Sequence, residues 1–319
     1  MPARETSRLR RTSNRAMTIA LLEPLPFASW EPTKTTLHLW CQIVGKIALS
    51  SSALRNHWWN CTLRPTAQGL KTELLGSGDT FFDIELDLVD HRAIVRASAG
   101  QEPVGFALRD GFSVAEFDAA LRAALRGVGV DIPILAKPYG FPGQSTPFAD
   151  DHANHAYDAA AVRRWWNAIA WSASVFERFA TEFAGKQGPV QLFWHGFDLA
   201  LGRYSGRRAG GPPKTDPVQR EAYSHEVIAF GFWPGDANVS APAYYTYTAP
   251  EPADLTTMPL APDGASWAPS GNGHMGLLPY ETVRTAEDPG AALLTFLRSG
   301  YDAGTRTAGW DAAALTHTP

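Results

Sequence analysis

Four segments with the composition of β-strands follow one another between residues 190 and 284, and no helix-length pattern separates them. Strands joined by loops alone pair as antiparallel neighbours, whereas parallel strands need a crossover of about a dozen residues or more. The segments are rich in aromatic side chains, which require a large core or a pocket to bury them. They are residues 190–204, 222–233, 243–248 and 276–284.

Helical patterns lie before and after these strands. Ser113 and Glu116 form a capping box that predicts a helix over residues 113–126. A longer pattern, residues 158–183, begins at a capping aspartate and repeats aromatic side chains every three or four positions. We therefore predict an α+β protein in which a largely antiparallel, aromatic-rich sheet is packed by two long helices.

The first half of the chain contains further strand patterns. Residues 57–63 and 81–89 alternate between apolar and polar side chains, which predicts two strands. The acidic positions of the second segment share one face, which we interpret as the solvent face of an edge strand. These positions are Asp83, Glu85 and Asp87.

The chain divides into a tail and two halves. Residues 1–16 are rich in arginine and are expected to be a disordered basic tail, or alternatively an upstream extension before a natural start at Met17. Residues 17–145 are predicted to form an N-terminal α+β half and residues 146–319 a C-terminal α+β half. The two halves are expected to pack as one compact unit.

Charge and hydropathy argue against two classes of partner. The formal net charge is −4, so the chain lacks the basic excess that neutralises the phosphates of nucleic acids. No segment approaches the roughly 18 apolar residues of a membrane helix. Cys41 and Cys61 lie too far apart for a redox pair or a zinc ribbon, which favours a cytoplasmic setting. A small-molecule ligand is the expected partner.

The stretch EAYSHEVIAFGFWPG, residues 221–235, holds a His-Glu pair within an aromatic strand. Neighbouring residues of a strand point to opposite faces, so His225 lies with Tyr223 and Trp233, and Glu226 lies on the other side. The zinc-protease motif H-E-x-x-H is not completed, because no second histidine follows. His225 is therefore interpreted as a general acid or base, or alternatively as a structural histidine satisfied by hydrogen bonds.

Asp198 is the best candidate for a functional carboxylate. It lies among apolar neighbours in the predicted strand 190–204, where an ionised carboxylate is costly unless it is paired. Asp198 or Glu226 is expected to orient the imidazole of His225. A structural ion pair with an arginine such as Arg203 is the alternative.

Arginines on this strand and in the following loop suit an anionic ligand. Arg203 and Arg207 are expected to clamp a carboxylate or phosphate group, with Arg208 beside them. A solvated loop is the alternative. Three aromatic residues are expected to line the same pocket: Trp194, Tyr223 and Trp233.

A metal site is the third possibility. His152 and His155 are spaced three apart and flanked by carboxylates, the side chains that commonly bind zinc. Asp158, however, is already needed to cap the following helix. We keep a metalloprotein with these histidines or His225 as an alternative, and the sequence identifies no cofactor.

Several long motifs resemble an uncharacterised bacterial family that is catalogued as a domain of unknown function. They include GFDLALGRYSGR, EAYSHEV and GFWPG, and the resemblance covers about residues 30–310. Relatives tend to have Gly-Ser where this chain has His195-Gly196, so the resemblance does not extend to His195. It implies one compact unit of bacterial, cytoplasmic origin and implies no reaction.

Together these observations predict an enzyme that acts on a small anionic or aromatic molecule. His225 would work with a carboxylate partner, and an arginine clamp would hold the anion. A non-catalytic small-molecule-binding protein is the second hypothesis, and a metalloprotein is the third.

Overall fold

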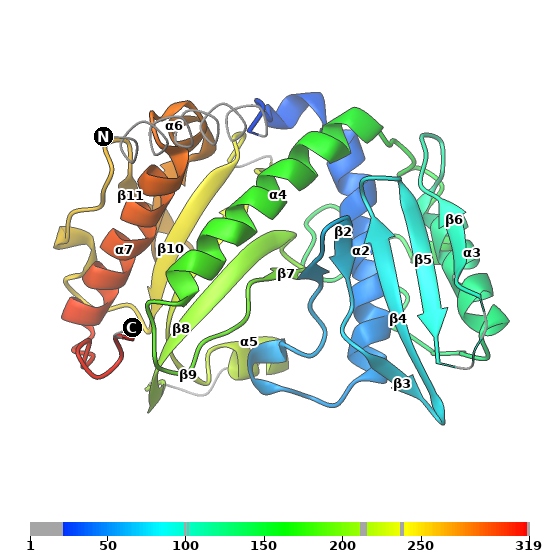
Figure 1. Ribbon diagram of the computed structural model, residues 1–319, viewed down its shortest axis with the longest axis horizontal. Coiled ribbons are helices and arrows are strands. Elements are labelled where there is room, and N and C mark those ends of the chain that lie inside the picture. Colours follow the sequence, from blue (N-terminus) through cyan, green and yellow to red (C-terminus); the bar gives the residue numbers. More distant parts are fainter. Residues whose placement is uncertain (1–21, 99, 101, 211–215, 237–238, 318–319) are drawn as a thin grey trace, which may run out of the picture.

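The computed structural model describes residues 22–317 apart from 99, 101, 211–215 and 237–238. The predicted tail at residues 1–16 and the proposed start at Met17 lie outside the described residues. The described chain forms two six-stranded antiparallel sheets flanked by helices (Figure 1). The predicted α+β class is therefore confirmed, with two sheets in place of one.

The first sheet has the order β1-β2-β4-β5-β6, and β3 pairs with β4. The alternation at residues 81–89 is confirmed, because Phe82, Ile84 and Leu86 are buried. The expected edge strand is wrong: β4 lies between β2 and β5, and Glu85 is buried and bonded to Arg96 at 2.6 Å. The strands are β1 (Arg64–Pro65), β2 (Gly69–Lys71), β3 (Leu75–Ser77), β4 (Thr80–Asp87), β5 (Arg92–Ala97) and β6 (Val104–Ala107).

Residues 57–63 do not form the predicted strand. Their first part is the 3₁₀ turn η2 (Asn56–Trp58), where His57 and Trp58 adopt positive φ angles of 57° and 63°. Leu63 then pairs with Leu192 of the second sheet, with N–H to O distances of 3.0 and 2.8 Å. This bridge connects the edges of the two sheets and places η2 beside the second sheet.

The second sheet has the order β11-β12-β10-β9-β8-β7. The predicted strand 190–204 is in fact two strands, because the chain turns at residues 194–197. The N–H of Phe197 donates to the carbonyl oxygen of Phe193 at 2.8 Å, and Phe197 has a φ of 59°. The strands are β7 (Gln191–Phe193), β8 (Asp198–Arg208), β9 (His225–Trp233), β10 (Ala243–Ala249), β11 (Ser266–Ser270) and β12 (Gly273–Pro279).

Helices begin where the sequence indicates a cap. Ser113 and Glu116 form the expected capping box of α3 (Val114–Gly127), and Asp158 caps α4 (Ala159–Ala180). The other helices are α2 (Glu31–Ser51), α5 (Pro217–Ala222), α6 (Tyr280–Thr285) and α7 (Pro289–Thr307), with the 3₁₀ turns η1 (Phe27–Ser29), η3 (Phe148–Asp150) and η4 (Leu255–Thr257). Among the described helices, none is both long and apolar enough to cross a membrane.

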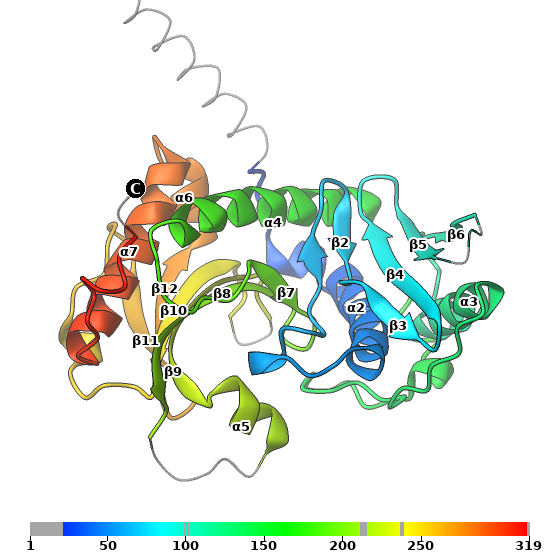
Figure 2. The ribbon, with the colours of Figure 1, turned by 60° about the horizontal axis from the view of Figure 1, so that its bottom comes forward.

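The two faces of the second sheet have different coverings. Helices α4 and α7 pack on one face, and in Figure 2 the short α5 lies on the opposite side of the curved strands. We call the first the helix face; its side chains include Leu199, Leu201, Arg203, Ile228, Phe230, Phe232 and Tyr244. We call the second the cavity face; its positions include Asp198, Ala200, Gly202, Tyr204, Val227, Ala229, Gly231, Tyr245 and Tyr247.

Candidate functional site

Two adjoining cavities lie on the cavity face. The inner cavity, of about 140 Å³, lies between the sheet and η2 and is lined by Asp198, Tyr245 and His57 among others. The outer groove, of about 690 Å³, lies beyond it toward β11 and β12. The two share three lining residues: Gln219, Tyr223 and Tyr247. We therefore treat them as two parts of one candidate site.

Asp198 and Tyr245 form the polar centre of the inner cavity. The Tyr245 hydroxyl donates to Oδ2 of Asp198 at 2.5 Å, a length typical of a charge-assisted bond between oxygens. Burial raises the pKa of Asp198, and the bond from Tyr245 opposes that rise. Burial and the adjacent carboxylate raise the pKa of Tyr245 well above its ordinary value. The proton of the Tyr245 hydroxyl therefore lies between the tyrosine oxygen and the Asp198 carboxyl group, in the wall of the inner cavity.

Two glycines make this pair possible. Tyr245 lies directly opposite Gly231 on the neighbouring strand, and a Cβ at Gly231 would lie 2.2 Å from the tyrosine ring. A Cβ at Gly196 would lie 2.5 Å from Oδ1 of Asp198. Real Cβ atoms do not tolerate such distances, so glycine at both positions lets the ring and the carboxylate approach the backbone.

A buried histidine fixes the turn that precedes Asp198. Nε2 of His38 donates to the carbonyl oxygens of Trp194 and His195 at 2.9 and 3.1 Å. Its ring stacks between Phe141 and Phe197, with centroid distances of 4.2 and 4.9 Å. Burial lowers the pKa of His38 to about 3, so the ring is neutral at physiological pH. A rigid, neutral support therefore sets the position of the carboxylate.

His57 forms another wall of the inner cavity, with one defined tautomer. Its Nδ1 lies 3.1 Å from the carbonyl oxygens of both Glu221 and Ala222, and carbonyls only accept, so Nδ1 carries the proton. Nε2 then accepts a hydrogen bond from Nζ of Lys186 at 2.8 Å. Burial and the charge of Lys186 lower the pKa of His57, which keeps the imidazole neutral.

Backbone strain is concentrated around the inner cavity. Four described residues other than glycine have a positive φ, and three of them, His57, Trp58 and Phe197, line or flank this cavity. Each such residue costs of order 1–3 kcal/mol and persists where the surrounding structure holds it. Strain of this kind clusters at functional sites, which supports a functional role for this region.

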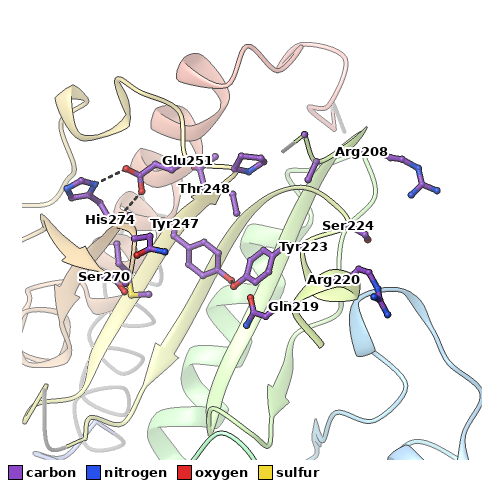
Figure 3. A pocket seen from close by; sticks show the side chains of 18 residues that line it. Arg208, Gln219, Arg220, Tyr223, Ser224, Tyr247, Thr248, Glu251, Ser270 and His274 are labelled. Carbon is purple, nitrogen blue, oxygen red and sulfur yellow. Dashed lines mark hydrogen bonds and ion pairs between the residues drawn. The ribbon is translucent and has the colours of Figure 1, made fainter. Parts of the chain in front are cut away.

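The outer groove has a tyrosine floor between two charged sides. The hydroxyls of Tyr223 and Tyr247 lie 3.2 Å apart, and Tyr247 stacks on Tyr245 of the inner cavity. Figure 3 shows Arg208 and Arg220 on one side of the tyrosine pair and Glu251 with His274 on the other. The N–H and Nδ1 of His274 donate to the Glu251 carboxylate at 2.5 and 2.7 Å.

The predicted faces of β9 are confirmed, but the residues of the predicted catalytic centre lie apart. Glu226 lies on the helix side and binds the hydroxyl of Ser205 and the guanidinium of Arg207, both at 2.8 Å. Arg207 also donates to the carbonyl oxygen of Ala308 at the end of α7. Glu226 and Arg207 therefore connect β9 and β8 to the end of α7 in a structural ion pair, and Glu226 does not orient His225.

Arg203 does not lie where an arginine that binds an anionic ligand was predicted. Its guanidinium lies 3.5 Å from the ring centroid of Phe179 and 4.6 Å from that of Tyr301. It donates to the Phe179 carbonyl oxygen and to Gln187. Burial lowers its pKa to about 10. Arg203 is enclosed by aromatic rings on the helix face and cannot reach a ligand in the cavities.

His225 does not pair with Asp198, because the two lie at opposite ends of the paired strands. Asp198 begins β8, whereas His225 is paired with Arg208 at the other end of that strand. The Nδ1 of His225 lies 3.0 Å from the Ser224 hydroxyl, and its ring meets that of His57 edge-on at 5.6 Å. His225 therefore lies beside the site and is not its centre.

The three predicted aromatic residues have different positions. Tyr223 lines both cavities as expected. Trp194 packs in the core against Gly45 of α2, because the turn at residues 194–197 removes it from the strand of Asp198. Trp233 ends β9 and lines neither cavity.

The described residues contain no group of three or more His, Cys, Asp or Glu side chains placed to hold one metal ion. His152 and His155 are exposed before α4. Asp158, next to them, caps that helix as predicted. The described residues around these histidines therefore give no support to the metal alternative.

Sequence reasoning missed several residues of the site. Tyr245 and Tyr247 alternate in AYYTYTA, and this alternation could have placed both hydroxyls on one face. Gly231 between aromatic strand positions is a typical signal of close approach by another group. Glu251 and His274 come from a loop and a strand far from β8 and β9 in the sequence, so no local pattern could have joined them to the site.

These features define a class of protein: an α+β protein whose second sheet carries a polar, tyrosine-rich site on one face and helices on the other. A family model covers residues 22–317, and the chain belongs to that family, described as a family of unknown function (DUF5996). Searches of curated proteins and of solved structures each found no match.

Proposed function

We propose that this protein is an enzyme that acts on a small organic molecule by proton transfer, with Asp198 as the acid–base group in place of His225. The observation that carries the proposal is the 2.5 Å bond between Tyr245 and Asp198 in the wall of a cavity. A carboxyl in a cavity wall that is positioned by a tyrosine hydroxyl is a typical arrangement for a group that exchanges protons with a ligand.

In this mechanism Asp198 exchanges a proton with an atom of the substrate in the inner cavity. The Tyr245 hydroxyl donates its hydrogen bond to the carboxylate form of Asp198 and stabilises its negative charge. Asp198 returns to its starting protonation state by proton exchange with product or solvent at the end of the cycle. His195, which lines the same cavity, is the neighbouring group that can relay a proton to or from Asp198.

The proposal keeps an anionic group on the substrate but changes the arginines that bind it. Arg203 and Arg207 are engaged on the helix face, whereas Arg208 and Arg220 line the outer groove. Guanidinium groups at a groove next to an acid–base pair suit a carboxylate or phosphate on the substrate. A cytoplasmic setting is part of the same proposal, and the buried free thiols of Cys41 and Cys61 support it.

The test is a metabolite screen followed by two substitutions. Ligands that raise the melting temperature of the wild-type protein are incubated with it, and products are detected by mass spectrometry. Asp198→Asn and Tyr245→Phe keep the shape of each side chain, and we expect Asp198→Asn to lower kcat by about 10²–10⁴-fold, the usual effect of removing an acid–base group. Tyr245→Phe should lower kcat by a smaller factor.

Glu226→Gln is the matched control, because it changes a carboxylate on the opposite face of the same sheet. It should leave kcat unchanged. Full activity in Asp198→Asn would contradict the proposal. Stabilisation of the wild-type protein by a ligand that is never converted would favour the second hypothesis, a non-catalytic binding protein.

A further inference from the structure

We infer that the outer groove binds a bipolar small molecule, with its anionic group at Arg208 and Arg220 and its ammonium group at Glu251. This inference deepens the proposed function by naming the class of substrate, and it rests on the proposal that groove and inner cavity form one site. The ligand class follows from the charges on the two sides of the groove.

The cationic side carries two arginines that have no ionic partner among the described residues. Arg208 ends β8, and Arg220 lies in α5; both side chains are exposed at the edge of the groove, where Figure 3 shows them directed away from the tyrosine pair. Within the described part of the chain, neither guanidinium has a hydrogen bond or an ion pair. The adjacent Arg207 differs, because it binds Glu226 and two backbone carbonyls. Arg208 and Arg220 are therefore available to an anionic group of a ligand.

The anionic side carries a carboxylate held in a fixed position. Glu251 accepts two hydrogen bonds from His274, one from its N–H and one from Nδ1. A Cβ at residue 273 would lie 2.3 Å from Oε2 of Glu251, so Gly273 lets the carboxylate lie against β12. A carboxylate offers about four acceptor directions and these bonds use two. The remaining directions can accept an ammonium group.

The floor between the two sides suits the organic middle of such a molecule. Tyr223 and Tyr247 lie between the arginines and the Glu251–His274 pair (Figure 3). Their rings offer apolar surface, and tyrosine faces also attract cations. The groove volume of about 690 Å³ falls within the range typical of small-molecule sites. Opposite charges at its two sides favour a molecule that carries both charges over a simple anion.

Calorimetric titration with charge-blocked probes tests this inference. The probes are α-amino acids, ω-amino acids and dipeptides, which separate the two charges by increasing distances. Each is compared with its N-acetylated and its C-amidated form. We expect at least one zwitterion to bind, and each block to weaken its binding by about tenfold or more, as charge-assisted hydrogen bonds imply.

Substitutions then assign each charge to one side of the groove. In Glu251→Gln the acetyl block should no longer weaken binding, and in the double variant Arg208→Gln/Arg220→Gln the amide block should no longer do so. Arg207→Gln and Glu226→Gln, which change the same residue types on the helix side, should bind the zwitterion like the wild-type protein. If a variant fails to fold, the comparison of blocked and unblocked probes on the wild-type protein still decides.

Three results would overturn the inference: no zwitterion binds, the blocked probes bind as well as the zwitterions, or the control variants lose as much affinity as the groove variants. Failure of the proposed function gives a different result. Asp198→Asn should bind the probe like the wild-type protein even if Asp198 has no role in turnover, because that residue does not line the outer groove.

Discussion

Each face of the second sheet carries a charged residue, but only the one on the cavity face lines a cavity. On the helix face Arg203 is enclosed by Phe179 and Tyr301. On the cavity face Asp198 has one tyrosine partner and lines a cavity. The difference lies in the covering, because two long helices close one face and the six-residue α5 covers only part of the other. A charged residue becomes available to a ligand where the covering elements leave its hydrogen bonding incomplete.

Glycines follow the same division. Gly300 and Gly304 of α7 let that helix pack against Thr246 and Thr248 on the helix face. Gly231 on the cavity face leaves room for the ring of Tyr245. Small residues therefore bring a helix close on one side, and on the other they bring a functional side chain close. The following substitutions test whether the two faces separate stability from ligand binding.

The largest effect is expected from Arg203→Gln. The variant loses the contact of the guanidinium with the Phe179 ring and its hydrogen bond to the Phe179 carbonyl oxygen. We expect a loss of about 2–4 kcal/mol in the free energy of unfolding, since both interactions are buried. Urea denaturation measures this loss.

Ligand affinity should be unchanged in folded Arg203→Gln, measured by calorimetry with the probe that binds the wild-type protein. The physical reason is that the guanidinium lies on the opposite face from both cavities. A fall in affinity comparable to that of Arg208→Gln/Arg220→Gln would show that the helix face also contributes to the site.

Two alanine substitutions sharpen the comparison further. In Gly304→Ala the new Cβ would lie 2.6 Å from Cδ1 of Ile228 and Oγ1 of Thr248, inside a packed interface. We expect a loss of about 1–3 kcal/mol in the free energy of unfolding, as for other overpacked cores, with ligand affinity retained.

Gly231→Ala should show the reverse balance. Its Cβ would lie 2.2 Å from the Tyr245 ring, which can move toward the inner cavity at a smaller loss of stability. The displaced ring breaks the bond to Asp198, so turnover should fall as in Tyr245→Phe. If Gly231→Ala kept its turnover but lost much of its stability, the cavity face would respond to substitution as the helix face does, which would contradict the comparison.

Sequence patterns predicted much of this division, and the reason is local geometry. Strand alternation placed Glu226 and His225 on opposite faces, and Ser113 and Asp158 marked true helix starts. The period of two residues in strands and of 3.6 residues in helices is set by the local backbone geometry, so the sequence shows directly which side chains share a face.

The candidate site could be predicted only in part. Asp198 and Tyr223 were identified, but the turn at residues 194–197 broke the face on which Trp194 was expected. That turn depends on His38, more than 150 residues earlier in the chain. Contacts of this kind, and the enclosure of Arg203 by α4 and α7, arise from tertiary packing. No local pattern encodes them.

A pH-dependent difference is expected between the wild-type protein and Asp198→Asn. Burial raises the pKa of Asp198 in the folded protein, so the folded state holds the proton more tightly than the unfolded chain does. Stability from this residue is therefore present at low pH and is lost as the pH rises from the ordinary carboxyl pKa to the raised one, by at most about 1.4 kcal/mol per pH unit.

Asp198→Asn removes this loss because an amide does not titrate. The stability of the variant relative to the wild-type protein should therefore increase with pH across that range, measured by urea denaturation at a series of pH values. His38, whose pKa is lowered by burial and which is not coupled to Asp198, destabilises both proteins equally in acid and cancels in the difference. His195 is coupled to Asp198 and does not cancel; without the carboxylate its pKa falls further, which changes the difference in the same direction. A constant difference across the pH range would contradict a raised pKa.

The smallest effect is expected from Glu226→Gln on the helix side. The carboxylate binds Arg207 at 2.7 Å, and about half of the arginine side chain is exposed, 51%. Exposed ion pairs contribute about 1 kcal/mol or less, so the free energy of unfolding should fall by no more than that, and by less still at high salt.

His225, one residue earlier on the opposite face, supplies the comparison. His225→Gln, next to the cavities, should change ligand affinity more than it changes the free energy of unfolding. If Glu226→Gln changed affinity as much as His225→Gln, the sheet would transmit changes from one face to the other, and its faces could not be treated as independent.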